Sequence, residues 1–151
     1  MILRLAPVLL MLSLPLPVQA DEAALSVAFG QCIGQAETAE DLRLCKGTVQ
    51  SMCLDQTPEK GEGGCWQAEH LLWALDGAAQ VRLARDWAAA RGVLPQFETA
   101  NDAFAGYVLA ECDLMAAATQ GNAEREVAAI ACGAGLYAER SIALRLLVQR
   151  P

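Results

Sequence analysis

Apolar side chains recur every three to four residues through most of the chain after residue 20, which is the spacing of one face of an α-helix. Alternation with a period of two never persists long enough to predict a strand. The residues that favour helices, Ala, Leu, Glu, Gln and Arg, are abundant in these stretches. The pattern predicts an all-α fold of about five helices, over residues 22–36, 39–54, 65–91, 96–119 and 123–149.

The apolar positions of the three long helices predict a shared core. They are Trp66, Leu72 or Trp73, Ala79 or Gln80, Leu83 and Trp87 in the third helix, Phe97, Phe104, Tyr107 or Val108, and Leu114 or Met115 in the fourth, and Val127, Ile130, Leu136, Leu144 and Leu147 in the fifth. Periodic stripes of this kind build helical cores more often than ligand sites. We expect an up-and-down bundle, in which a long C-terminal hairpin packs on the 65–91 helix and a shorter N-terminal helical pair is clipped to it.

The first twenty residues have the pattern of a signal peptide. Arg4 is their only charge, and an apolar run interrupted by prolines follows over about residues 5–16. The run ends in a small-x-small pattern at residues 18–20, which predicts cleavage after Ala20. An uncleaved anchor is the alternative, but the run is short for a membrane span and broken by proline. We therefore expect a single periplasmic or secreted domain over residues 21–151, with no membrane anchor.

The chain has more acidic than basic residues, and this excess limits the kinds of molecule that we expect it to bind. The whole chain has 11 basic and 18 acidic residues, and removal of Arg4 with the signal peptide leaves a net charge near −8. Such a surface repels nucleic acid and anionic lipid, and it attracts cationic proteins. We expect no nucleic-acid partner.

All six cysteines lie after the predicted cleavage point, and an even number in an exported chain indicates disulfides. Zinc is the alternative, but no C-x-x-C motif occurs and His70 is the only histidine. A catalytic cysteine is disfavoured as well, because an oxidising compartment would pair it.

Helical geometry selects one pairing among the fifteen that six cysteines allow. Residues equidistant from the turn of a helical hairpin face each other, and each pair of neighbouring cysteines is centred on a turn. The three turns are a capping box at Thr38-Ala39-Glu40-Asp41, a breaker cluster over residues 57–64 and the Gly121-Asn122 step. The predicted disulfides are Cys32–Cys45, Cys53–Cys65 and Cys112–Cys132.

The residue types that catalysis needs are scarce. No nucleophile elbow, zinc-protease, P-loop or dinucleotide-binding motif occurs. Glu69 and His70 are adjacent on a helix and point to different faces, so they form no dyad. The carboxylates are expected in helix caps and on exposed faces, and Glu139 and Arg140 on a solvated face beside the last apolar stripe. We predict no enzyme activity, no cofactor and no metal site.

The C-terminal half carries a pattern that resembles a known family. Phe104, Tyr107, Glu111 and Cys112 are followed about twenty residues later by Cys132, Leu136, Arg140 and Leu144, and Glu69 and Trp73 follow Cys65 at helical spacing. Over about residues 65–147 this resembles the LprI-like lysozyme inhibitor family of small exported bacterial helical proteins. The resemblance implies a scaffold role for the matched residues. Phe104, Tyr107, Leu136 and Leu144 would pack the hairpin, and Arg140 would reach Glu111 or a carbonyl across it.

The resemblance also implies a function, which is binding and inhibition of a cationic lysozyme-type muramidase by occlusion of its cleft. Residues 57–64, with Glu59 and Glu62, are the candidate binding loop, although a plain connector is the alternative. The family has an Asp near position 74 and a Leu-Asn-x-x-Tyr motif that ends near position 81. This chain has Ala74, Ala78 and Val81 instead. These differences support, almost as well, an alternative, which is an envelope structural or stress-related protein that makes no contact with lysozyme.

Overall fold

The computed structural model describes residues 18–150. The predicted signal peptide lies outside the described residues except for positions 18–20, which begin the first helix. The helices are α1 Val18–Gln35, α2 Ala39–Leu44, α3 Thr48–Gln56, the 3-10 helix η1 Pro58–Lys60, α4 Gly61–Ala90, α5 Leu94–Ala118 and α6 Asn122–Val148. No strand occurs in this part of the chain. The predicted all-α, disulfide-stapled bundle is confirmed.

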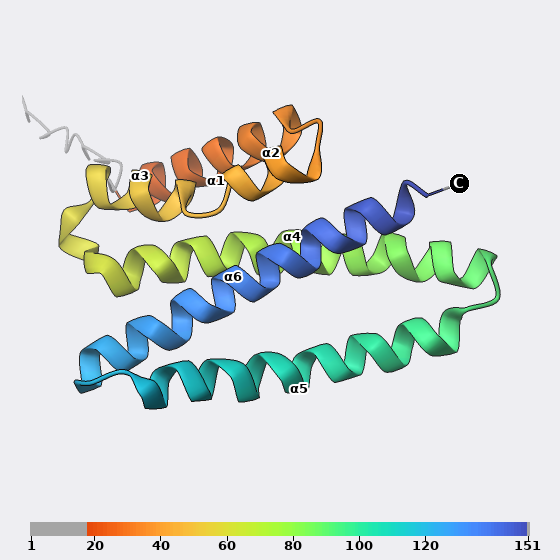
Figure 1. Ribbon diagram of the computed structural model, residues 1–151. Helices are drawn as coiled ribbons and strands as arrows, with labels where there is room; N and C mark the ends of the chain where they lie inside the picture. The colour runs from red at the N-terminus through yellow and green to blue at the C-terminus, as the bar shows by residue number, and fades with distance from the viewer. Residues whose placement is uncertain (1–17, 151) are drawn as a thin grey trace, which may run out of the picture.

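The three long helices form the body of the molecule, and α1 to α3 cover one side of it (Figure 1). Helices α4 and α5 form an antiparallel hairpin, and α6 crosses α4 diagonally on its return. The crossing is close because α6 contributes small side chains to it. Gly133, Ala134, Ala138 and Ser141 are all buried. A Cβ at Gly133 would lie 3.3 Å from the ring of His70, so no larger residue fits there without movement of that ring.

Two apolar cores lie at opposite ends of α4. The larger core contains residues of α1, α2, α3, α4 and α6 and surrounds Trp73. The Trp73 ring meets the Phe29 ring edge-on at a centroid distance of 4.8 Å. The smaller core lies where α4 ends and α5 begins, and its members are Ala84, Ala88, Phe97 and Leu144. Because α6 contributes to both cores, it ties the N-terminal helices to the α4–α5 hairpin.

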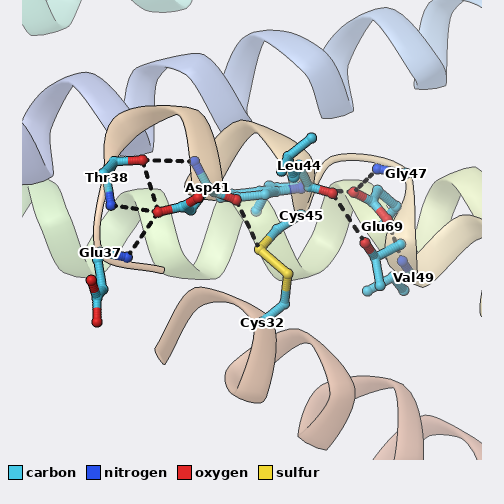
Figure 2. The surroundings of a disulfide bond; sticks show 11 residues. Cys32, Glu37, Thr38, Asp41, Leu44, Cys45, Gly47, Val49 and Glu69 are labelled. Carbon is cyan, nitrogen blue, oxygen red and sulfur yellow. Dashed lines mark hydrogen bonds between the residues drawn. A yellow bond between two sulfur atoms is a disulfide. The ribbon is translucent and has the colours of Figure 1, made fainter. Parts of the chain in front are cut away.

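The structure contains all three predicted disulfides. Cys32–Cys45 joins α1 to the end of α2, Cys53–Cys65 joins α3 to α4, and Cys112–Cys132 joins α5 to α6. The predicted capping box is also confirmed, since the Thr38 hydroxyl accepts from the Asp41 N–H at 3.1 Å and the Asp41 carboxylate accepts from the Thr38 N–H (Figure 2). The Asp41 carboxylate also accepts from the Thr38 hydroxyl at 2.8 Å, and this bond, followed by the one from the Thr38 N–H, lowers the pKa of Asp41. The disulfides indicate an oxidising environment, extracellular or periplasmic.

Two predicted boundaries are wrong. The helix expected over residues 39–54 is interrupted between α2 and α3, because Gly47 adopts a φ of 81°, which is left-handed backbone that favours glycine. The loop expected over residues 57–64 is almost absent, because η1 follows α3 directly and α4 begins at Gly61. Gly61, the first residue of α4, has a φ of 66°, a backbone conformation that favours glycine.

Several predicted core positions are exposed. Leu83, Leu114 and Met115 face solvent. Of the alternatives Tyr107 and Val108, Val108 is buried and Tyr107 is 51% exposed. The buried face of α4 runs instead through Cys65, Glu69, Trp73, Gly77, Gln80, Ala84 and Ala88. Apart from Trp73, the residues of this buried face are small or polar. The apolar stripe predicted from the sequence therefore lies partly on the wrong side of α4.

By length and composition α6 could cross a membrane, and it is the one such helix in residues 18–150. It packs against α2, α4 and α5 in this fold. A core helix passes the same test, so the finding is weak evidence for a membrane span.

Candidate functional site

A buried carboxylate organises the junction between the N-terminal helices and α4. Glu69 is 1% exposed and accepts four hydrogen bonds. Its Oε1 accepts from the Gly47 N–H at 2.9 Å and from the Trp73 indole at 2.7 Å. Its Oε2 accepts from the N–H groups of Val49 at 2.9 Å and Gln50 at 3.0 Å. Figure 2 shows the carboxylate reaching Gly47 and Val49 beside the Cys32–Cys45 bridge.

The four bonds explain why a charged group is stable in this core. The first N–H groups of a helix have no partner within the helix, and they carry partial positive charge. Glu69 supplies that partner to α3 from a different helix, and Trp73 uses the remaining lone pair. Glu69 is thus a helix cap, as expected of the carboxylates, but it caps a different helix from its own and is buried.

A groove between the first halves of α4 and α6 adjoins Glu69. Its inner part is a cavity of about 150 Å³ lined by Gly47, Glu69, Trp73 and neighbours. Its outer part is a wider hollow of about 550 Å³, and both parts are lined by Trp66 and Ala131. We call the two parts together the α4–α6 groove.

The outer part of the groove has an acidic rim. Glu62, in the first turn of α4, and Glu124, in the first turn of α6, both line it and are exposed. Both stand at helix N-termini, where the helix dipole stabilises the charged carboxylate. The side wall is the indole of Trp66, which is half-buried. A cationic side chain entering here would meet two carboxylates and an aromatic face.

A cationic side chain of the protein itself lines the inner end of the groove. Lys46 donates to Glu139 at 2.7 Å, and Arg43 donates to the same carboxylate at 3.4 Å. The bond from Lys46 is the main cause that lowers the pKa of Glu139, while partial burial raises it. Glu139 is thus an ion-pair centre linking α2 to α6, and it is not the merely solvated residue that the sequence predicts.

A second polar cluster crosses the α4–α6 interface. The Asp76 carboxylate accepts hydrogen bonds from the Ser141 hydroxyl and from the Arg145 guanidinium. Ser141 is fully buried, and Asp76 is largely so. The sequence does not predict this cluster, because Asp76 lies on α4 while Ser141 and Arg145 lie on α6. No short sequence motif contains residues of both helices.

Neither contact predicted for Arg140, with Glu111 or with a carbonyl across the hairpin, occurs among the hydrogen bonds and ion pairs of the described residues. The Arg140 guanidinium lies 5.4 Å from the centre of the Phe104 ring. Its Nε and Nη2 atoms are buried and have no hydrogen-bond partner among the described residues. Burial lowers the pKa of this guanidinium.

The other positions that the family resemblance singles out fall into three groups. Glu69, Trp73 and Leu144 are buried, while Phe104, Glu111 and Leu136 are half-buried. Tyr107 faces solvent, and Tyr137 takes the packing role expected of it. The Tyr137 ring meets Phe104 edge-on at 5.6 Å and His70 at 5.2 Å. The resemblance therefore marks scaffold residues, and it does not mark the rim of the groove.

His70 gives the fold a dependence on pH. Burial lowers its pKa below the usual value of about 6.5. Between the folded and unfolded pKa values the unfolded chain binds more protons, so stability falls as pH falls below about 6.5. We expect the urea midpoint to decrease from pH 7.5 to pH 5.5. In His70→Phe, which keeps a ring against Tyr137 but does not titrate, the decrease should be much smaller. Equal decreases in the two proteins would contradict this assignment.

No group of three His, Cys, Asp or Glu side chains that could hold a metal ion occurs among residues 18–150. What the groove offers is non-covalent recognition by charge and an aromatic surface.

Comparison with protein-family models, with curated proteins and with solved structures finds no match to this chain.

Proposed function

We propose that the chain is exported through the signal peptide of residues 1–20 and acts outside the cytoplasm as a protein-binding module. The acidic rim of the α4–α6 groove would take a basic side chain of a cationic partner. The observation that carries this proposal is that Glu62, Glu124 and Trp66 line one hollow. The resemblance to the LprI-like family suggests a lysozyme-type muramidase as the partner, inhibited by occlusion of its cleft.

The electrostatics support this choice of partner. A net charge of −7 on the whole chain attracts a cationic protein at long range and raises the association rate at low salt. Within the groove, an arginine or lysine would pair with the carboxylates and lie against the Trp66 indole. Such a cation–π contact contributes about 0.5–2 kcal/mol.

The groove is also rigid, which lowers the entropic cost of binding. Cys65, next to Trp66, bonds to Cys53 of α3. Cys132, next to Ala131, bonds to Cys112 of α5. Each wall of the groove is thus covalently tied to a neighbouring helix.

The test is a lytic assay with the mature protein and a c-type lysozyme on bacterial cell walls. We expect micromolar protein to slow lysis, with less inhibition as the salt concentration rises. The double variant Glu62→Gln/Glu124→Gln should weaken inhibition roughly tenfold, corresponding to about 1.4 kcal/mol. The matched control is Asp86→Asn/Asp102→Asn, which removes two exposed charges from α4 and α5 outside the groove lining.

If lysis is not slowed and no complex forms on a sizing column, the muramidase proposal is wrong. The envelope structural or stress-related role would then stand. Inhibition that both double variants retain in full would keep the partner and remove the groove as its binding surface.

A further inference from the structure

The two parts of the α4–α6 groove differ in their chemistry. The outer part has the free carboxylates of Glu62 and Glu124 at its rim. The inner part has two charged residues in its lining, Lys46 and Glu69, and both are already paired within the fold. Lys46 donates to Glu139 at 2.7 Å, and Glu69 accepts four hydrogen bonds. The inner part therefore suits an uncharged, apolar group better than a second cation.

The surfaces that a group in the inner part would touch are small or aromatic. Trp66, Ala131 and Gly135 line it and are half-buried, so they keep accessible surface. Trp73 and Glu69 also line it, but they are almost completely covered and an occupant would not contact them. The volume is about 150 Å³, and a cavity of about that size holds a benzene molecule. The inner part thus has the size and the walls for one phenyl ring.

Gly135 leaves space in the wall that α6 contributes. A Cβ at this position would have no packing neighbour within 4 Å, whereas a Cβ at Gly133 would lie 3.3 Å from the His70 ring. Close packing therefore requires glycine at position 133 and does not require it at position 135, although glycine weakens a helix. A larger side chain at position 135 would occupy the inner part of the groove.

The rim and the inner part are separated by a distance that a short peptide can span. Glu62 stands about two turns before Glu69 in α4, and Glu124 stands about two turns before Ala131 in α6, which corresponds to about 10 Å along each helix. In an extended segment, side chains two residues apart point to the same side and lie about 7 Å apart. The length of an arginine side chain covers the remaining distance.

We propose that the groove recognises an extended segment of its partner that carries a basic residue and, two residues away, a phenylalanine. The basic group pairs with Glu62 and Glu124, and the phenyl ring enters the inner part between Trp66 on α4 and Gly135 on α6. Trp66 lines both parts of the groove, so its indole contacts both side chains. This inference rests on the proposed function, because it takes the acidic rim as the place of the basic side chain. It adds an apolar anchor that charge alone does not provide.

The test is calorimetric titration of the mature protein with the pentapeptide Arg-Gly-Phe-Gly-Arg, blocked at both ends. This sequence reads the same in both directions, so it presents the required spacing whichever way it lies in the groove. We expect saturable binding with a dissociation constant on the order of 0.1–1 mM. Alanine in place of the peptide's phenylalanine should weaken binding roughly tenfold, because the ring is no longer buried. Citrulline in place of both arginines keeps the shape without the charge and should also weaken binding roughly tenfold.

A matched pair of variants examines the inner part directly. Gly135→Leu fills it, so the phenylalanine and alanine peptides should bind this variant equally. Gly106→Leu, on the exposed face of α5, also places a Cβ where it has no packing neighbour, and it should keep the roughly tenfold preference for phenylalanine. Both variants should unfold at or above the temperature of the unmodified protein, because leucine favours a helix more than glycine does. Should Gly135→Leu fail to fold, the three peptides decide the matter on the unmodified protein.

Three results would overturn the inference. They are equal affinities of the unmodified protein for the phenylalanine peptide and either of its analogues, an undiminished preference for phenylalanine in Gly135→Leu, and absence of saturable binding up to about 10 mM. The lytic assay fails separately. A preference for the phenylalanine peptide without inhibition of lysozyme would remove the muramidase and keep this recognition, whereas inhibition without that preference would keep the muramidase and remove the aromatic anchor.

Discussion

Replacement of Glu69 by alanine is expected to lower the free energy of unfolding by about 3–5 kcal/mol, the cost typical of removing one partner from a buried charged network. The substitution removes the acceptor of four donors at once. Three are the backbone N–H groups that begin α3, and the fourth is the Trp73 indole. All four donors lose a charged acceptor, and hydrogen bonds to a charged group contribute more to stability than bonds between neutral groups.

Urea unfolding, followed by tryptophan fluorescence and by circular dichroism, measures this loss. The control Glu59→Ala, on the exposed surface of η1, should change stability by less than about 0.5 kcal/mol. Glu69→Gln should fall between the two, because its amide nitrogen cannot accept hydrogen bonds. A loss below about 1 kcal/mol for Glu69→Ala would show that the network contributes little.

The same change has a local signature. Glu69 connects α3 to α4, so its loss should loosen α3 before the α4–α6 pair opens. Hydrogen exchange should therefore accelerate most at the amides of Val49 and Gln50. Exchange that accelerates equally along α6 would contradict a local role for the carboxylate.

The elements that sequence reasoning predicts well are those with local causes. The Thr38–Asp41 capping box is contained in four residues, and the same four residues make its bonds in the structure. The disulfide pairing follows from hairpin symmetry about turns, so it needs only the positions of the turns. The break at Gly47 is not predicted, although the segments on both sides of it are helical as predicted.

The sequence places Glu62 in a candidate binding loop, but it does not predict the rest of the site, whose residues meet only through the fold. Glu62 and Glu124 lie far apart in sequence, and they share a groove because α6 returns across α4. Glu69 carries no local sign that its partners belong to α3. Its spacing of four residues from Trp73 is the one signal that could have indicated a buried pair, since such residues share a helix face.

Loss of the Cys53–Cys65 disulfide has the second large expected effect. In the chain-entropy model, a bridge over 12 residues stabilises the fold by about 3 kcal/mol. Both cysteines are completely buried, so the double variant Cys53→Ala/Cys65→Ala also leaves a small void in the larger core. We expect a total loss of about 3–5 kcal/mol, measured by urea unfolding under non-reducing conditions.

The double variant Cys112→Ala/Cys132→Ala is the matched comparison. Its longer loop of 20 residues predicts about the same entropic loss, but Cys132 is only half-buried and neither cysteine belongs to the larger core. The Cys53–Cys65 variant should therefore be the less stable of the two. Because Glu69 and this bridge both hold α3 against α4, combining Glu69→Gln with it should give a non-additive loss. Strict additivity would mean that the carboxylate and the disulfide stabilise α3 independently.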